Sequence, residues 1–306
     1  MVVVAGQGAA GFADGVGSDA RFNKPIRLAP FGPDAVLVAD IYNHAIRIVS
    51  KDGRVATLAG APDRKGHQDG PAASARFSSP HGVGVSGDGR IAVAEAEGHT
   101  LRLLTRGPGG AYEVRTLAGA AATSGAADGP AEDARFNSPH AALWGADGSL
   151  YAPDIGNATI RRVKDGQVST VAGGGADKLV YPMDIAWAKD GRLLIADAGA
   201  NLLRTWKPGD QALGTLDVKG KLATPHGVAT GPDGTVYVAD MKSHRVLAID
   251  AAGVVTTVAG VEGAAGSDAV HLTRPAAVLV HAGWLWIADL DNHRICAVVA
   301  ASRRPD

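Results

Sequence analysis

The chain has 306 residues, with 41 glycines and only 5% aromatic residues, and its 30 Lys and Arg nearly balance its 31 Asp and Glu. This balance provides no net positive field for nucleic acid or an anionic membrane, so we expect neither partner. The sequence lacks a run of about 18 apolar residues, which argues against a membrane-spanning segment. Abundant Gly, often directly after Asp, favours short strands joined by tight turns over helices.

The start of the chain, MVVVAGQGAAG, has neither a basic beginning nor a long apolar core, so it does not read as a secretory signal. We expect a cytoplasmic protein for the chain as written, and an exported one if a signal segment preceded Met1. The single cysteine, Cys296, excludes an intrachain disulfide and any cysteine-based metal cluster. It lies in an apolar run, which predicts an inert core thiol.

An apolar strand that ends in an acidic residue recurs along the chain. Its copies read VLVAD, IAVAE, LYAPD, LLIAD, VYVAD and LWIAD, and they end at Asp40, Glu95, Asp154, Asp197, Asp240 and Asp289. The clearest surrounding unit, Thr224 to Gly260, contains four short apolar runs separated by turn residues. Four antiparallel strands per copy, at spacings of 43 to 59 residues, are typical of a propeller blade. The sequence therefore predicts an all-β fold, a six-bladed β-propeller of four-stranded antiparallel blades, with residues 1–306 as a single domain.

A second pattern marks the fourth strand of most copies. It reads VATLAG at 55–60, VRTLAG at 114–119, VSTVAG at 168–173 and VTTVAG at 255–260, with LGTLDV at 213–218 as a degenerate form. The sixth copy ends near Ala300 without such a strand, whereas the chain begins with VVVAG, which has this pattern. Because an open sheet edge invites aggregation, we expect Val2–Ala5 to pair onto the sixth blade and close the ring.

The loops that lead into the first three blades are long and alike, each with an Asp-Gly pair followed by Ala-Arg-Phe. We expect each Phe to pack between blades and each Arg to cap a carbonyl or pair with an acid. The loop before blade 6 is also long and those before blades 4 and 5 are short, so long loops should wall one side of the channel mouth. The repeated pairs are Arg21 and Phe22, Arg76 and Phe77, and Arg135 and Phe136.

The acidic residues that end the second strands recur in every copy, which favours a structural role over catalysis. We expect each carboxylate to accept hydrogen bonds from backbone N–H groups of the loop that follows it. The same reasoning assigns a structural role to the histidines at an equivalent loop position, His44, His99, His244 and His293.

These elements resemble the NHL-repeat family, whose repeat has the form Pro-x-Gly, a strand, an Asp-Gly turn, a strand ending in Ala-Asp, and then Asn-His-Arg-Ile. One copy contains Pro225-His226-Gly227, Asp233-Gly234 and Ala239-Asp240, and residues 292–295 read Asn-His-Arg-Ile. The resemblance covers essentially the whole chain. It implies a six-bladed propeller but does not select a function, because this fold serves enzymes, scaffolds and RNA binders.

The residue after Pro at the start of each inner strand should face the central channel. Around the ring these residues are Ile26, His81, His140, Met183, His226 and Ala276. Imidazoles from several blades could meet at one metal ion, and a thioether beside them would suit copper better than zinc. The prediction is a divalent zinc or copper site formed by His81, His140, His226 and Met183. The alternative is that these histidines bind water and one another.

One enzyme of the resembled family, peptidylglycine amidating lyase, takes three zinc-binding histidines from this Pro-His position on alternate blades and uses a loop Tyr as base. Asp40-Ile41-Tyr42 is similar to its Asp-Gly-Tyr. The matching ligand positions here are Ala276, His81 and Met183, so only one of the three is a histidine. The resemblance therefore implies a type of site, axial His with a phenol, but not that enzyme's zinc site or activity.

Four further residues are candidates for catalysis at this mouth. Tyr42 and Tyr181 are the phenols expected near the axis, and Arg27 and Asp184 replace the usual Gly of Pro-x-Gly. The charged pair either adds charge to the pocket or forms an internal pair.

The resemblance implies a small-molecule or peptide-processing enzyme of lyase type, in which a metal or a histidine cation stabilises an oxyanion while a base removes a proton. The alternative is a non-catalytic scaffold that binds a protein or peptide on the same face. In both cases we expect a monomer.

Overall fold

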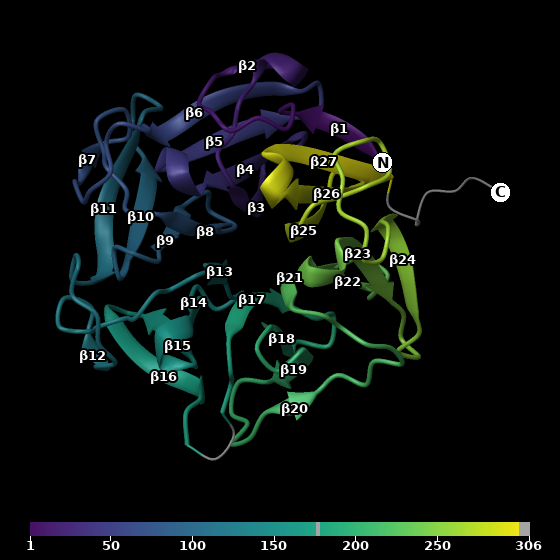
Figure 1. Cartoon of the computed structure of the whole chain (residues 1–306). Helices are drawn as coiled ribbons and strands as arrows, with labels where there is room; N and C mark the ends of the chain where they lie inside the picture. Colours follow the sequence, from purple (N-terminus) through teal and green to yellow (C-terminus); the bar gives the residue numbers. More distant parts are fainter. Residues whose placement is uncertain (176–177, 300–306) are drawn as a thin grey trace.

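The computed structural model describes residues 1–175 and 178–299 (Figure 1). Six antiparallel sheets surround a central axis, and each runs from an inner strand at the axis to outer strands at the rim. The first three blades contain, from the axis outwards, β3 (Pro25–Phe31), β4 (Ala35–Asp40), β5 (Ala45–Ser50) and β6 (Arg54–Gly60); β8 (Pro80–Val85), β9 (Ile91–Glu95), β10 (Thr100–Arg106) and β11 (Tyr112–Gly119); and β13 (Leu143–Trp144), β14 (Leu150–Asp154), β15 (Thr159–Lys164) and β16 (Gln167–Gly173).

The other three blades follow the same order from the axis to the rim. Their strands are β17 (Pro182–Trp187), β18 (Leu193–Asp197), β19 (Leu202–Trp206) and β20 (Gly214–Thr215); β21 (Pro225–Thr230), β22 (Val236–Asp240), β23 (Arg245–Ile249) and β24 (Val255–Gly260); and β25 (Pro275–His281), β26 (Trp284–Asp289), β27 (Arg294–Val299) and β1 (Val2–Ala5). The degenerate fourth strand of blade 4 is reduced to the two residues of β20. The predicted six-bladed, all-β propeller is confirmed.

The ring closes through the first strand of the chain, as the sequence predicts. Strand β1 pairs antiparallel with β27, with Val2 opposite Ala297 and Val3 opposite Cys296. Cys296 is fully buried in this sheet, and burial raises the pKa of its thiol to about 12. The thiol is therefore protonated at neutral pH, which confirms the prediction of an inert core cysteine.

Blades 1 to 3 carry a fifth strand that the sequence did not predict. Strands β2 (Gly15–Val16), β7 (Gly70–Pro71) and β12 (Gly129–Pro130) come from the long loops and pair with the outer strands β6, β11 and β16. In blade 1, Asp14 fixes this pairing, because its Oδ2 accepts a hydrogen bond from the Thr57 N–H at 3.0 Å. This part of each long loop therefore lies at the rim of the ring, and the expectation that the loops wall the mouth is wrong for it.

The repeated Arg-Phe pair has the structural role expected from the sequence. Phe22, Phe77 and Phe136 are all fully buried. The Nη1 atoms of Arg21 and Arg135 donate to carbonyl oxygens of their own loops.

The acidic end of each second strand holds the loop that precedes its own blade. Asp40 accepts a hydrogen bond from the Asn23 N–H at 2.7 Å, because Pro25 and Asp40 lie opposite each other in adjacent strands. The expectation that these carboxylates bond N–H groups of the following loop is therefore wrong in direction, although their structural role holds. Equivalent bonds join Ser78 to Glu95, Asn137 to Asp154, Val180 to Asp197, Ala223 to Asp240 and Thr273 to Asp289.

A buried arginine on the third strand links the acid to the long loop in blades 1 to 3. Arg47 is fully buried and contacts Asp40 at 3.0 Å through Nη1 and Asp14 at 2.7 Å through Nη2. Arg102 and Arg161 repeat this bridge in blades 2 and 3. Since each guanidinium joins a strand end to a loop, the repeated charges form part of the scaffold and are not available for chemistry.

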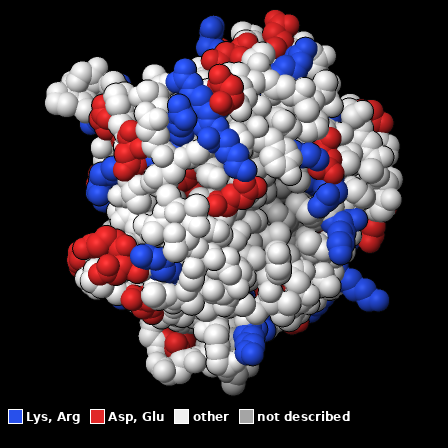
Figure 2. Space-filling view, turned by 60° about the vertical axis from the view of Figure 1, so that its left-hand side comes forward, with Lys and Arg blue, Asp and Glu red and all other residues white. Residues whose placement is uncertain are grey.

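In the part of the chain that the structure describes, the helical content is limited to short 3-10 turns. Among the described residues no helix is long and apolar enough to cross a membrane. On the face shown in Figure 2, basic and acidic side chains lie beside one another. The turns are η1 (Gly17–Asp19), η2 (Ile41–Asn43), η3 (Ile155–Asn157), η4 (Met241–Ser243) and η5 (Leu290–Asn292).

Candidate functional site

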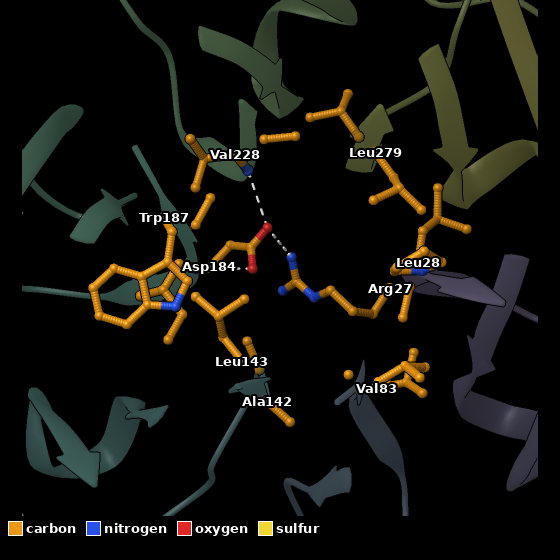
Figure 3. Close-up of a pocket in the computed structure, with 18 of the residues that line it drawn as sticks. Arg27, Leu28, Val83, Ala142, Leu143, Asp184, Trp187, Val228 and Leu279 are labelled. Atoms are coloured by element: carbon orange, nitrogen blue, oxygen red, sulfur yellow. Dashed lines mark hydrogen bonds and ion pairs between the residues drawn. The ribbon is translucent and has the colours of Figure 1, made fainter. Parts of the chain in front are cut away.

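An ion pair between opposite blades crosses the central channel. Arg27 in β3 places Nη1 at 2.5 Å from Oδ2 of Asp184 in β17, and the two residues are only 4% and 6% exposed. Nη2 of Arg27 donates to the Met183 carbonyl at 2.9 Å, while Asp184 accepts from the N–H groups of Ile185 and Val228 (Figure 3). Of the two interpretations of these residues, the structure supports internal pairing. We call this contact the axial ion pair.

The position of the axial ion pair follows from the Pro-x-Gly pattern. At the equivalent place, two of the other blades carry Gly82 and Gly227, where an added Cβ would lie 2.7 Å and 2.6 Å from backbone atoms of the next blade. At these two positions even a methyl side chain would require the neighbouring backbone to shift. Arg27 and Asp184 are therefore the long polar side chains at this level of the channel, and they come from blades that face each other.

The axial histidines lie on the loop side of the ion pair, one residue before its level in their strands. The rings of His81 and His140 are 4.3 Å apart between centroids and tilted by 39°. Nδ1 of His81 is 2.9 Å from the Ser79 carbonyl oxygen, and Nδ1 of His226 is 2.8 Å from that of Ala276. A carbonyl oxygen can only accept, so Nδ1 carries the proton and, in the neutral ring, Nε2 presents a lone pair.

Burial holds all three axial imidazoles in the neutral form. It lowers the pKa of His81 to about 4 and that of His226 to about 3, with the nearby Arg27 charge acting in the same direction. Burial, and then the neighbouring His81, lower the pKa of His140 well below its usual value. The proposed role of a histidine cation toward an oxyanion or anionic ligand therefore does not fit this site at neutral pH.

The structure brings the three histidines together but does not join the other predicted residues to them. Across residues 1–175 and 178–299, no group of three or more His, Cys, Asp or Glu side chains is arranged to hold a metal ion. Met183 is half-buried, and its carbonyl serves the axial ion pair. Tyr42 and Tyr181 are 55% and 50% exposed. The zinc or copper site and the catalytic phenols remain predictions.

A charged residue that the sequence interpretation missed lies beside the histidines. Glu97 pairs with Lys65 at 2.6 Å, a hydrogen bond that lowers the pKa of this carboxyl. Its charge weakly opposes the lowering of the His81 pKa by burial. Glu97 occupies the same repeat position as Tyr42, two residues after the strand-end acid. A comparison of this repeat position between blades 1 and 2 could have identified Glu97 from the sequence.

A cavity lies on the other side of the axial ion pair. Its volume is about 260 Å³, and it is lined by the third to sixth residues of the inner strands, such as Arg27–Pro30 and Asp184–Trp187 (Figure 3). It therefore occupies the half of the channel that is remote from the histidines. No sequence pattern indicates this cavity, because its walls are mostly Val, Leu and Ala, which resemble ordinary core residues.

Comparison with protein families finds a match to the NHL repeat at residues 222–249. Two curated proteins are similar over parts of the chain. The Arabidopsis thaliana protein SUPPRESSOR OF QUENCHING 1 is 30% identical over 105 residues, which is 34% of this chain and 10% of that protein. Human NHL repeat-containing protein 2 is 31% identical over 118 residues, or 38% of this chain and 16% of that protein. The matched segments thus span only a small part of either relative.

Solved structures with the same fold have several functions. An auxiliary nutrient binding protein from Bacteroides thetaiotaomicron has a TM-score of 0.71 at 13% identity, covering 97% of this chain and 75% of that one. A gluconolactonase from Xanthomonas campestris has a TM-score of 0.65 at 14% identity, covering 91% and 86%. A virginiamycin B lyase from Staphylococcus aureus has a TM-score of 0.61 at 14% identity, covering 91% and 85%. These likenesses concern the fold alone, and with the repeat match they describe the chain as a six-bladed β-propeller that contains an NHL repeat.

Proposed function

We propose that the protein is a lyase-like enzyme that processes a small molecule or peptide at the loop-side mouth of its channel. The observation that carries this proposal is the fixed tautomer of His81 and His226. Each ring donates through Nδ1 to a backbone carbonyl, which leaves Nε2 as an acceptor, and His226 is buried while His81 is half-buried. Such an acceptor selects a ligand with N–H or O–H groups, such as an amide or an alcohol.

Because their pKa values are low, these imidazoles are unprotonated at neutral pH and can act as weak bases. A pKa of about 4 for His81 is close to that of a carboxylate, a group that serves as a general base in many enzymes. In an elimination, the base takes a proton from carbon, the C–H electron pair forms a double bond, and the leaving group departs with its own bonding pair. Glu97, which interacts electrostatically with His81, would help to hold the proton once it has been transferred.

A non-catalytic binding protein is the second candidate, because one observation favours it. Tyr42 and Tyr181 are both half exposed, and no hydrogen bond or ring contact among the described residues joins either phenol to an axial histidine. A site that has hydrogen-bond acceptors but no phenol bonded to them can bind a ligand with N–H or O–H groups without catalysing its reaction. The nutrient binding protein among the structural neighbours shows that the fold accommodates such a role.

The test uses a panel of small peptides that contain O-acylated serine or threonine, which carry N–H donors and can eliminate a carboxylic acid. Binding is followed through the ring C–H signals of the histidines by NMR, and turnover through the ultraviolet absorbance of the dehydroamino acid product. We expect binding and turnover in the wild type, and loss of both in His81→Phe. Binding without turnover would support the scaffold instead, and no change at any axial histidine signal would contradict both proposals at this mouth.

His293→Ala is the matched control for this experiment. It also removes an imidazole, but from the loop position, where Nδ1 accepts a hydrogen bond from the Lys24 N–H at 3.1 Å. We expect it to bind and turn over the panel like the wild type, with a change in stability alone.

A further inference from the structure

The cavity on the far side of the axial ion pair is a separate compartment from the histidine mouth. Arg27 extends across the middle of the channel to Asp184, with apolar side chains around it (Figure 3). Leu28, Val83 and Leu279 are among the residues that form the apolar wall. One end of the cavity is therefore a polar floor, and its sides are hydrocarbon.

The polar floor has more hydrogen-bond donors than acceptors. Asp184 is ion-paired with Arg27 and already accepts from the Ile185 N–H at 2.8 Å and from the Val228 N–H at 3.0 Å. Arg27 has five N–H groups, of which Nη1 faces Asp184 and Nη2 donates to the Met183 carbonyl. Its Nε is buried without a hydrogen-bond partner among the described residues, although Arg27 as a whole is only 4% exposed. An incoming acceptor would satisfy this surplus.

The floor is charge-balanced, which limits the charge of any occupant. Burial lowers the pKa of Arg27 and raises that of Asp184, and the attraction between the two charges opposes both shifts. A ligand anion placed there would compete with Asp184 for Arg27 and leave one buried negative charge uncompensated. A neutral acceptor, such as a carbonyl oxygen, can bond to the free donor without that cost.

We propose that this cavity binds a small, neutral and largely apolar molecule whose carbonyl oxygen accepts a hydrogen bond from Arg27. The volume of about 260 Å³ is sufficient, since an apolar cavity of roughly 150 Å³ holds benzene. Trp144 and Trp187 also line it, and they are fixed to each other because Nε1 of Trp187 donates to the Trp144 carbonyl at 3.0 Å. This site goes beyond the proposed function, lies on the other side of the axial ion pair, and does not depend on the histidines.

The test compares three probes of similar size: acetophenone, which is neutral with a carbonyl; ethylbenzene, which lacks it; and benzoate, which is an anion. Each is titrated into the full chain, and the indole N–H signals of Trp144 and Trp187 are followed by NMR. We expect acetophenone to bind about tenfold more tightly than ethylbenzene, as one hydrogen bond allows, and benzoate to bind more weakly than acetophenone. Signals of Trp284, which lies outside the cavity lining, should not shift.

Two variants locate the binding. Leu143→Trp fills the cavity from its wall and should abolish acetophenone binding, whereas Val254→Trp adds the same side chain at a position that is 46% exposed and should leave it unchanged. The double variant Arg27→Met with Asp184→Asn should remove the preference for acetophenone over ethylbenzene. Melting curves of each variant show whether it is folded.

The wild-type probe series decides the proposal even if a variant fails to fold. Equal binding of acetophenone and ethylbenzene, or a preference for benzoate, would overturn the role of Arg27. No shift of Trp144 or Trp187 with any probe would show that this half of the channel holds solvent only.

Discussion

Nδ1 of His44 in blade 1 accepts a hydrogen bond from the backbone N–H of Ser79 at the start of blade 2, at 3.3 Å. The same contact recurs in blades 2, 5 and 6, so a loop histidine connects each of these four blades to the next. Blade 4 uses an amide instead, where Oδ1 of Asn201 accepts from the Thr224 N–H at 2.7 Å. The other histidine contacts join His99 to Ser138, His244 to Arg274 and His293 to Lys24.

The presence of Asn201 at the position equivalent to His44 suggests a matched pair of variants at His44. His44→Ala should lower the free energy of unfolding by about 1–2 kcal/mol, because the buried Ser79 N–H loses its acceptor. His44→Asn should cost much less, since Asn201 performs the same role at a positive φ of 57°, close to the 49° of His44. Chemical denaturation of both variants checks the prediction. Equal losses would show that the hydrogen bond is unimportant and that packing of the ring matters.

The axial histidines should make the fold sensitive to acid. His226 has an ordinary pKa of 6.5 that burial lowers to about 3, so below pH 6.5 the unfolded chain binds a proton that the folded chain excludes. Stability from this group is complete above pH 6.5 and is lost as pH falls toward 3, on the order of 5 kcal/mol. His226→Gln should flatten the dependence of the unfolding free energy on pH in this window. An unchanged slope would mean that the imidazole is hydrated or charged in the folded state.

Breaking the axial ion pair from one side should cost more than removing both charges. Arg27→Met leaves the Asp184 carboxylate buried without its cation and should lower stability by about 3–5 kcal/mol. Adding Asp184→Asn keeps an oxygen acceptor for the Val228 N–H and removes the charge, so most of that loss should return. The melting temperatures of the single and double variants test this coupling. A double variant that is less stable than Arg27→Met would contradict it.

Removal of the closing strand should destabilise the whole ring. Deleting Val2–Gly6 exposes the edge of β27 and the buried surface around Cys296, and the lost ladder and the burial of Val4 amount to roughly 3 kcal/mol or more. Thermal unfolding of the truncated chain measures the effect, with Val2→Thr as a control at a position that is 54% exposed. An unchanged melting temperature in the truncated chain would show that β1 is not required for closure.

Local rules made the architecture predictable. A proline at the start of each inner segment and a strand end such as Val236–Asp240 repeat in every blade, and Asp-Gly turns repeat in most. The spare Val2–Ala5 has the pattern of the strand that blade 6 lacks. The fifth strand was missed because Gly15–Val16 is too short to show alternation and depends on a carboxylate contact far away in sequence.

The site was less predictable, because its properties depend on distances across the channel. The sequence placed His81 and His140 near the axis, but it does not show the burial that is the main cause of their lowered pKa values. Pairing between Arg27 and Asp184 was one of two open interpretations, and only the ring geometry brings blades 1 and 4 into contact. The remote cavity has no sequence signal, since Val83 and the residues around it resemble any buried strand.

Because β1 and β27 share one sheet, β1 has to wait for its partner until the ribosome has made the five blades that lie between them in the sequence. Throughout synthesis, five blades can form in order while the sixth lacks a member and the chain ends remain unjoined. The contact between Val3 and Cys296 spans nearly the whole chain, so its loop-closure entropy is among the largest that this fold must overcome. Completion of the ring is thus a natural late step in folding. A circular permutant, with the present termini joined and new termini opened between two blades, would close the ring at another blade without changing the propeller.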